Sequence, residues 1–248
     1  MTVDWTPLQA ELAIWRREGL SLPIWWRDDD AVADTPALQR LISLAEELRM
    51  NVHVAIIPDL LEPSLSSPLA SRHTVPVVHG WRHVSHAPQG AKNAEFGATR
   101  ADAAHELAEG LAKLQARFGA RTLPLFVPPW NRIGADATQL LPAAGYRGLS
   151  TYGPRRSVLV ANGITQINTH IDPIFWRGHR GLVEPETLVT DLTIELRTRR
   201  AGETDASEPL GLLTHHLVHT DDVWSFSRDV LSVLLEGGAQ PADLSALL

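Results

Sequence analysis

Short apolar runs alternate with amphipathic segments along most of the chain. Segments 6–19, 36–48, 99–118, 184–199 and 223–235 carry apolar residues at helical spacing, which predicts helices. The apolar runs have the length of buried strands, and they lie at 22–26, 52–57, 75–78, 123–127, 147–152, 164–171 and 210–213. About seven short strands alternating with helices indicate parallel βαβ units and an α/β fold.

The positions of the acidic, histidine and tryptophan residues help to decide whether this sheet is open or closed into a barrel. An open, doubly wound sheet gathers its site at one switch point, whereas a barrel collects residues from many strands at its carboxyl mouth. Here, acidic residues, histidines or tryptophans follow the first, third, fourth, sixth and seventh runs. We therefore expect a (β/α) barrel. No repeat or break in composition divides the chain, so we expect a single domain over residues 1–248.

Composition narrows the classes of function. The net charge is −7 and the basic residues are scattered, which argues against a nucleic-acid partner. There is no cysteine, so a bound metal would need His, Asp or Glu ligands. The first 19 residues lack a basic region followed by an unbroken apolar stretch, and no apolar run approaches the ~20 residues that span a bilayer. We expect a cytoplasmic protein without a membrane partner.

Three adjacent carboxylates, Asp28, Asp29 and Asp30, end the first predicted strand. Carboxylates this close repel one another, and a partly dry pocket makes that repulsion costly unless a cation compensates. The alternative is an ordinary acidic turn at the surface. The triplet thus predicts either a cation site or a solvated turn.

His79 and His83 follow the third predicted strand and are four residues apart. On a helical turn they share a face, and their ring nitrogens can meet one metal at ~2.0–2.1 Å. By itself this spacing is equally typical of unrelated polar histidines, and His86 reads as a loop residue. The predicted barrel mouth brings the pair to the acidic triplet, which favours a shared metal site.

Three further segments could line a cavity at the same mouth. Prolines 128 and 129 stiffen the turn before Trp130, which offers a flat wall for a sugar or is simply a buried side chain. In the sixth run, alternation places Asn168, His170 and Asp172 on one face, which indicates a lined cavity or a wet edge strand. The seventh run ends near three histidines, any of which could act as a general acid or lie in a solvated loop: His215, His216 and His219.

In this order, the segments resemble the polysaccharide deacetylase family (the NodB-homology family of metal-dependent carbohydrate esterases) from about residue 22 to residue 220. The resemblance implies a distorted barrel of seven or eight strands. It implies that Asp29 is the general base, while Asp30, His79 and His83 hold a divalent metal, zinc first, with cobalt, nickel or manganese as alternatives. The Asp28–Asp29 pair remains an alternative, shifted by one residue.

The resemblance also assigns the acid and shows departures. His215 fits the closing motif because it follows Gly-Leu-Leu-Thr, and Asp172 resembles the residue that orients the acid. The family's strand-four arginine is replaced by Val127, and we expect Arg132 to supply the missing catalytic charge. The residues expected to contact the substrate are Trp81, Pro129, Trp130 and His170.

The expected activity is metal-dependent hydrolysis of an N-acyl group, in the first place the N-acetyl group of an amino sugar. The departures leave a second reading open, in which the same site cleaves a non-carbohydrate amide or acts on a nucleotide-linked sugar. A third reading is a catalytically inactive barrel that acts as a binding protein. The expected partner is a carbohydrate or another small molecule, and the oligomeric state is open.

Overall fold

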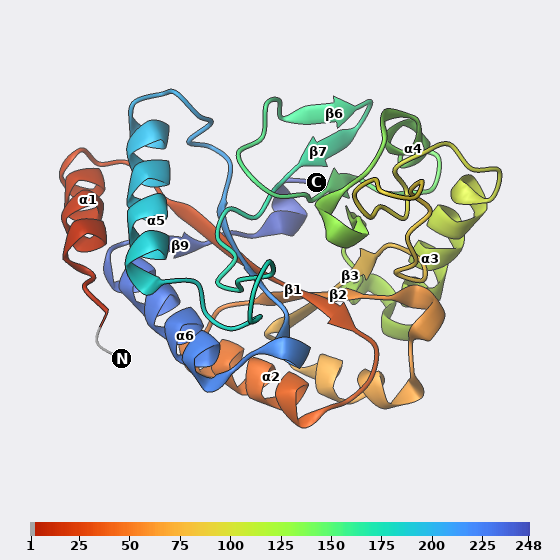
Figure 1. Ribbon diagram of the computed structural model, residues 1–248, viewed down its shortest axis with the longest axis horizontal. Helices are drawn as coiled ribbons and strands as arrows, with labels where there is room; N and C mark the ends of the chain where they lie inside the picture. The colour runs from red at the N-terminus through yellow and green to blue at the C-terminus, as the bar shows by residue number, and fades with distance from the viewer. Residues whose placement is uncertain (1–2) are drawn as a thin grey trace.

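The computed structural model describes residues 3–248 as a central sheet flanked by helices (Figure 1). The helices are α1 Thr6–Arg17, α2 Pro36–Leu48, α3 Ala103–Phe118, α4 Ala135–Leu140, α5 Pro185–Arg200 and α6 Asp221–Glu236. The strands are β1 Pro23–Ala31, β2 Val52–Ile56, β3 Thr74–His79, β4 Leu125–Val127, β5 Gly148–Leu149, β6 Leu159–Ala161, β7 Ile164–Gln166, β8 Leu210–Thr214 and β9 Gln240–Pro241.

The sheet follows the order β6-β7-β5-β4-β3-β2-β1-β8, with β9 beside β1. Every pairing from β7 to β8 is parallel, and only β6 runs antiparallel to its neighbour. The two ends of the path approach each other through an irregular segment, in which Thr169 bridges to Tyr152 and Ile171 bridges to Leu212. The parallel α/β fold expected from the sequence is confirmed, with its last link made by isolated bridges instead of a regular strand.

Several element boundaries differ from those expected. The run at 164–171 is regular only to Gln166, and its first part forms an unexpected hairpin with β6. The run at 147–152 contains a strand of only two residues, 148 and 149. β1 extends to Ala31, so the three carboxylates lie within a strand and not after it.

Side chains of β1 point alternately to the inner side of the sheet and to the outer side, which the helices cover. Trp25 packs with Ala55, Val77, Val127 and Ile167 in one core cluster. Trp26, the next residue, belongs to the larger cluster that the helices cover. Because side chains alternate along a strand, Arg27 and Asp29 follow Trp25 on the inner side, and Asp28 follows Trp26 on the outer side.

Helix α2 is fixed at its start by capping. The Thr35 hydroxyl accepts a hydrogen bond from the Leu38 N–H at 3.1 Å, and Pro36 occupies the first helical position. Thr220 caps α6 in the same way through Val223 N–H. These caps set where the chain turns back from the mouth of the sheet into its helices.

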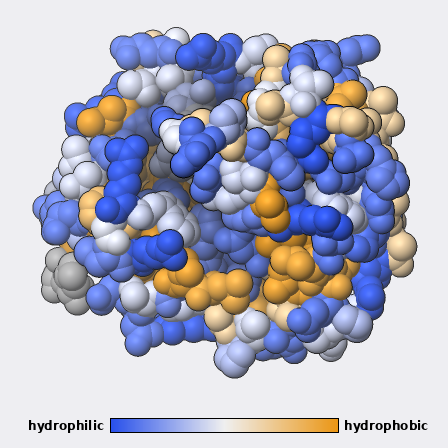
Figure 2. Space-filling model, turned by 45° about the vertical axis from the view of Figure 1, so that its right-hand side comes forward, coloured by the Kyte–Doolittle hydropathy of each residue, from blue (hydrophilic) through white to orange (hydrophobic). Residues whose placement is uncertain are grey.

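The surface in Figure 2 is mostly hydrophilic, with hydrophobic side chains gathered in the lower half of the view. Among residues 3–248, no helix combines the length and the apolar character that a bilayer-spanning segment requires.

Candidate metal centre and active site

A bulge at the end of β1 decides which carboxylates face the mouth. The register of β1 against β2 shifts between Asp28 and Ala31, and Asp30 has a left-handed backbone with φ of 73°. The bulge breaks the alternation, so Asp29 and Asp30 both line the cavity at the mouth. Two consecutive residues of a regular strand would point to opposite faces.

Asp28 is turned away from this cavity. It is fully buried and accepts hydrogen bonds from the Thr214 hydroxyl at 2.7 Å and from the His216 N–H at 3.0 Å. Burial alone would raise the pKa of Asp28, but the adjacent His216 ring outweighs burial and lowers it. The geometry therefore favours Asp29–Asp30, and not Asp28–Asp29, as the pair at the mouth.

Asp30, His79 and His83 form a group that can hold a metal ion. Asp30 Oδ1 lies 3.1 Å from His79 Nε2 and 3.3 Å from His83 Nε2, and the three ligand atoms lie within 4.8 Å of one another. Two imidazoles and a carboxylate from separate segments suit zinc and similar metals, and three protein ligands leave a coordination position for water or substrate. The donor set fits a catalytic metal.

The second nitrogen of His79 supports the same conclusion. His79 Nδ1 lies 3.1 Å from the carbonyl oxygen of Val127 on β4. A carbonyl only accepts, so Nδ1 carries the hydrogen and Nε2 presents its lone pair to the metal position. Burial lowers the pKa of His83, which favours its neutral, ligating form. For His79, the carboxylates of Asp29 and Asp30 outweigh burial and raise the pKa.

The two histidines meet through a turn, so the expected helical turn is wrong. Gly80 has φ of 57° and His83 has φ of 60°, both left-handed. The Glu95 carboxylate accepts hydrogen bonds from the backbone N–H groups of Trp81 at 3.0 Å and Arg82 at 2.7 Å. A Cβ atom on Gly80 would lie 2.1 Å from Glu95 Oε2, so only glycine fits. Sequence reasoning missed Glu95, which is distant along the chain.

Asp29 is held by an arginine of its own strand. Arg27 Nε lies 2.9 Å from Asp29 Oδ1, and Arg27 Nη2 donates to Asp29 Oδ2 at 3.1 Å. The same guanidinium donates to Asn131 Oδ1 at 2.6 Å and to the Ser150 hydroxyl at 2.7 Å. Both members of the pair are buried, so Asp29 has a fixed orientation.

Arg132 does not supply the charge beside the base, and that expectation is wrong. Its Nη1 donates to the carbonyl oxygen of Asn93 at 2.8 Å, and the partner of Asp29 is Arg27. The signal was present in the sequence: an arginine two residues before Asp29 on one strand shares its face. Arg132 nevertheless lines the cavity.

Among the three histidines after β8, only His215 lines the cavity. Its Nε2 lies 3.9 Å from Asp29 Oδ2. His216 Nδ1 instead pairs with Asp28, and His219 Nε2 accepts a hydrogen bond from the backbone N–H of His215. The geometry thus distinguishes three histidines that sequence reasoning could not separate.

Asp172 lines the same cavity, and an unpredicted tryptophan stands between it and His215. Trp176 Nε1 donates to Asp172 Oδ2 at 2.7 Å, and the Trp176 ring lies edge-on to the His215 ring with centroids 4.6 Å apart. Burial raises the pKa of Asp172, with His215 acting in the opposite direction. In residues 3–248, the hydrogen bonds to the Asp172 carboxylate come from Trp176 and Ile174, not from His215.

The cavity has a volume of about 740 Å³, which suits a small-molecule ligand. Trp130 forms part of its wall, with its ring centroid 4.3 Å from that of His83. The residues that line the cavity are Asp29, Asp30, His79, His83, Trp130, Asn131, Arg132, Tyr152, Asp172, Ile174, Trp176, Arg177, Arg180 and His215. Tyr152, Trp176, Arg177 and Arg180 were not among the candidate site residues expected from the sequence.

Three residues expected to contact the substrate lie elsewhere. Trp81 is buried in the core with the Lys113 ammonium 4.9 Å from its ring centroid, and Pro129 is buried beside Gly80. His170 is on the outer side of its segment: its Nδ1 accepts from Gly211 N–H and its Nε2 lies 3.3 Å from Glu208 Oε2. None of the three lines the cavity, so these predictions are wrong.

Backbone strain is concentrated around this cavity. Within residues 3–248, six residues other than glycine have positive φ: Asp30, Arg49, His83, Trp130, Asn131 and Arg180. All except Arg49, which ends α2, line the cavity. Left-handed backbone at such residues costs of order 1 kcal/mol each and clusters where a site over-determines it. The strain supports the choice of this cavity as the candidate functional site.

Comparison with known proteins gives a clear answer on the fold. No family model matches the chain, and no curated protein matches it. Solved structures do match. A T48 deacetylase crystallised with substrate is 15% identical, with a TM-score of 0.57 over 92% of this chain and 90% of that chain. A family 4 carbohydrate esterase from Streptomyces lividans in complex with acetate is 13% identical, with a TM-score of 0.56 over 89% and 92%.

The chain has the fold of the family 4 carbohydrate esterases. The resemblance seen in the sequence motifs is therefore confirmed at the level of fold. A third structure with this fold is a mutant of a family 4 pseudoenzyme with restored enzymatic activity; it is 13% identical, with a TM-score of 0.59 over 92% of this chain and 67% of that chain. The fold thus accommodates both active and inactive members, and function must be argued from the side chains.

Proposed function

We propose that this protein is a metal-dependent hydrolase that removes an N-acyl group, in the first place the N-acetyl group of an amino sugar. One observation carries the proposal: the Asp30–His79–His83 group, Asp29 and His215 all line one cavity at the carboxyl ends of parallel strands. Metal ligands, a candidate base and a candidate acid are the parts that amide hydrolysis needs.

Asp30, His79 and His83 would hold the metal, zinc in the first place. When bound there, a divalent metal supplies Lewis-acid chemistry, which lowers the pKa of water and draws charge from an acyl oxygen. Asp30 on the bulge of β1 and His83 in the turn after β3 must both reach the position of His79, which is consistent with the strained backbone at Asp30 and His83.

The remaining residues move protons and orient the substrate. Asp29, fixed by Arg27, accepts the proton of the attacking water at a carboxylate oxygen. His215 donates a proton to the leaving nitrogen, because an amine departs poorly without one. Trp176 and Asp172 restrict the His215 ring, so Asp172 acts as a positioning residue. Trp130 supplies a flat apolar wall.

A second candidate keeps the chemistry and changes the substrate to a non-carbohydrate amide or a nucleotide-linked sugar, and the departure at Val127 favours it. A third candidate, an inactive binding protein, draws support from the pseudoenzyme of the same fold. The presence of Asp29 and His215 argues against an inactive protein, because both side chains can transfer protons.

Metal analysis followed by acetate release tests the proposal. The protein is purified without a histidine tag, its metal content is measured, and acetate release from N-acetylated sugars and simple acetamides is followed. We expect about one zinc or similar ion per chain and acetate release that a chelator stops. Metal-loaded protein that releases no acyl group from either substrate class would contradict the proposal.

A further inference from the structure

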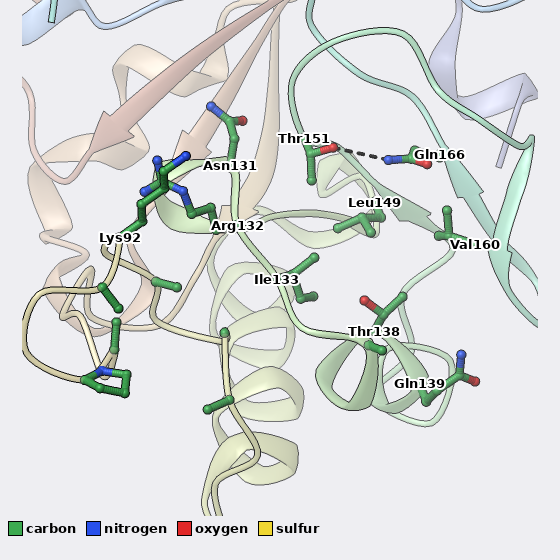
Figure 3. A pocket seen from close by; sticks show the side chains of 17 residues that line it. Lys92, Asn131, Arg132, Ile133, Thr138, Gln139, Leu149, Thr151, Val160 and Gln166 are labelled. Atoms are coloured by element: carbon green, nitrogen blue, oxygen red, sulfur yellow. Dashed lines mark hydrogen bonds between the residues drawn. The ribbon is translucent and has the colours of Figure 1, made fainter. Parts of the chain in front are cut away.

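A second cavity adjoins the metal centre (Figure 3). Its volume is about 760 Å³, and it shares Asn131 and Arg132 with the cavity that holds the metal ligands. The loop at 87–98, residues 131–133 and helix α4 contribute most of its wall, and Leu149, Thr151, Val160 and Gln166 complete it. We call it the side cavity. Asn131 and Arg132 thus belong to the walls of both cavities.

The charged side chains of the side cavity are all positive. Lys92 and Arg132 are its only charged residues, and none of the 17 residues that line it is Asp or Glu. The chain as a whole carries −7, so a cavity of this size without a carboxylate departs from the composition around it. The metal cavity differs, because there Asp29, Asp30 and Asp172 face its arginines.

Arg132 and Asn131, which the side cavity shares with the metal cavity, leave hydrogen-bond donors for a ligand, whereas Gln166 uses its Nε2 on the Thr151 hydroxyl at 3.2 Å. Arg132 uses Nη1 on the carbonyl oxygen of Asn93, which fixes the side chain and leaves its other N–H groups for a ligand. Asn131 accepts from Arg27 through Oδ1, so its amide N–H groups are also left to donate. Figure 3 shows Lys92 and Arg132 at one side of the cavity and Gln166 at the other. Cations together with amide donors suit a carboxylate or a phosphate.

We propose that the side cavity binds an anionic group carried by the acylated substrate, with Arg132 and Lys92 as its partners. This inference rests on the proposed deacylation and specifies its substrate class: an acylated amine with an acidic substituent, such as a sugar phosphate or an acidic amino sugar. Arg132 faces both cavities, so it places the acyl group at the metal when it holds the anion.

Binding measurements test the proposal without relying on turnover. Isothermal titration of the full chain, with and without zinc, compares N-acetylglucosamine with two charged probes, its 6-phosphate and N-acetylmuramic acid. We expect at least one charged probe to bind about tenfold more tightly than the neutral sugar, because charge-assisted hydrogen bonds are about twice as strong as neutral ones. The better probe identifies the anion as phosphate or carboxylate. Inorganic phosphate alone reports how much of the affinity the anion supplies.

Matched variants test whether Arg132 and Lys92 cause the preference for the charged probes over the neutral sugar. Arg132→Gln and Lys92→Gln should each reduce it about threefold or more, and raising the salt concentration should reduce it in the wild type. Arg228→Gln removes an exposed arginine on α6 that lines neither cavity, and should leave the preference unchanged. Equal affinities for all three sugars would overturn the proposal. So would a preference that survives both Gln variants, or one that only Arg177→Gln or Arg180→Gln removes.

The two proposals fail in different ways. Charged probes that bind through Lys92 and Arg132 without any acyl release would contradict the deacylase and keep the anion site. Equal rates of acetate release from neutral and charged sugars, with equal affinities, would contradict the anion site and keep the deacylase.

Discussion

Arg27 and Asp29 pair on the inner side of one strand, with Arg27 Nε 2.9 Å from Asp29 Oδ1 and both side chains buried. A spacing of two residues on a strand aligns both side chains on one face, so β1 alone supplies the candidate base and the cation that orients it. At the position on β4 where the polysaccharide deacetylase family has an arginine, this chain has Val127, which packs with Trp25 on the inner side of the sheet. In this chain the cation beside the candidate base therefore comes from β1.

Weakening the contact between Arg27 and Asp29 should impair catalysis more than substrate binding. Arg27→Lys keeps the charge but loses the two-point contact with Asp29, so the carboxylate gains freedom. We expect kcat to fall about 10- to 100-fold with a small change in KM, because misplacing a catalytic group costs about this much. Steady-state kinetics measure the split. Arg228→Lys, an exposed control, should behave as the wild type, and an Arg27→Lys enzyme that matches it would refute the role of the pair.

Metal content should separate the two consecutive carboxylates. Asp30→Ala and His83→Ala each remove a ligand atom and should lower bound metal well below one ion per chain. Asp29→Asn should keep the metal and lower kcat about 10³-fold, in the range for loss of a general base. Metal analysis and acetate release on the same preparations check this. Loss of metal from Asp29→Asn, with retention in Asp30→Asn, would reverse the two roles.

The neighbouring histidines 215 and 216 should give different phenotypes. His215→Asn should lower kcat about 10²- to 10⁴-fold with little loss of stability, as expected for a general acid. His216→Ala leaves the Asp28 carboxylate buried without its partner and should lower the free energy of unfolding by about 3–5 kcal/mol. Urea unfolding and kinetics of both variants test this pair. Activity lost only in a well-folded His216 variant would mean that the acid has been assigned wrongly.

The sequence predicted most of the fold from local patterns, and it predicted the three residues of the candidate metal group from local patterns together with the family resemblance. Seven apolar runs between helices indicated the parallel sheet, and the ends of the first and third runs indicated the acidic triplet and the pair His79 and His83. The family resemblance then selected Asp30 from the triplet. Sequence reasoning failed where long-range contacts decide. The turn at Gly80 depends on Glu95, the link at residues 169–171 is made by isolated bridges, and period-two alternation placed His170 at the mouth although it faces Glu208.

Gly80→Ala should disturb the metal site without touching a ligand. A Cβ atom there would lie 2.1 Å from Glu95 Oε2 and 2.5 Å from Pro129 Cγ, and the φ of 57° already disfavours any other residue. The turn that brings His83 to Asp30 must then shift. We expect weaker metal binding, measured by competition with a chromophoric chelator. Gly163→Ala is the control, since it has a positive φ in the β6–β7 hairpin and open space around it. Equal metal affinity in both alanine variants would show that the Gly80 turn does not position His83.

His53 should make the protein less stable as the pH falls from about 6.5 to about 4. Burial lowers the pKa of His53 from 6.5 to about 4, with the hydrogen bond to the Trp26 carbonyl and the charge of Asp243 opposing it. Between these values the unfolded chain binds a proton that the folded chain does not, so the free energy of unfolding decreases as the pH decreases. His53→Asn keeps a donor near Nδ1 and does not titrate. Its loss of stability between pH 7 and pH 4.5 should be smaller than that of the wild type by about 2 kcal/mol.

Urea unfolding in the presence of a chelator measures this difference without a contribution from metal release. His105→Asn, an exposed substitution on α3, is the control and should follow the wild type. Parallel stability curves for the wild type and His53→Asn would contradict the prediction.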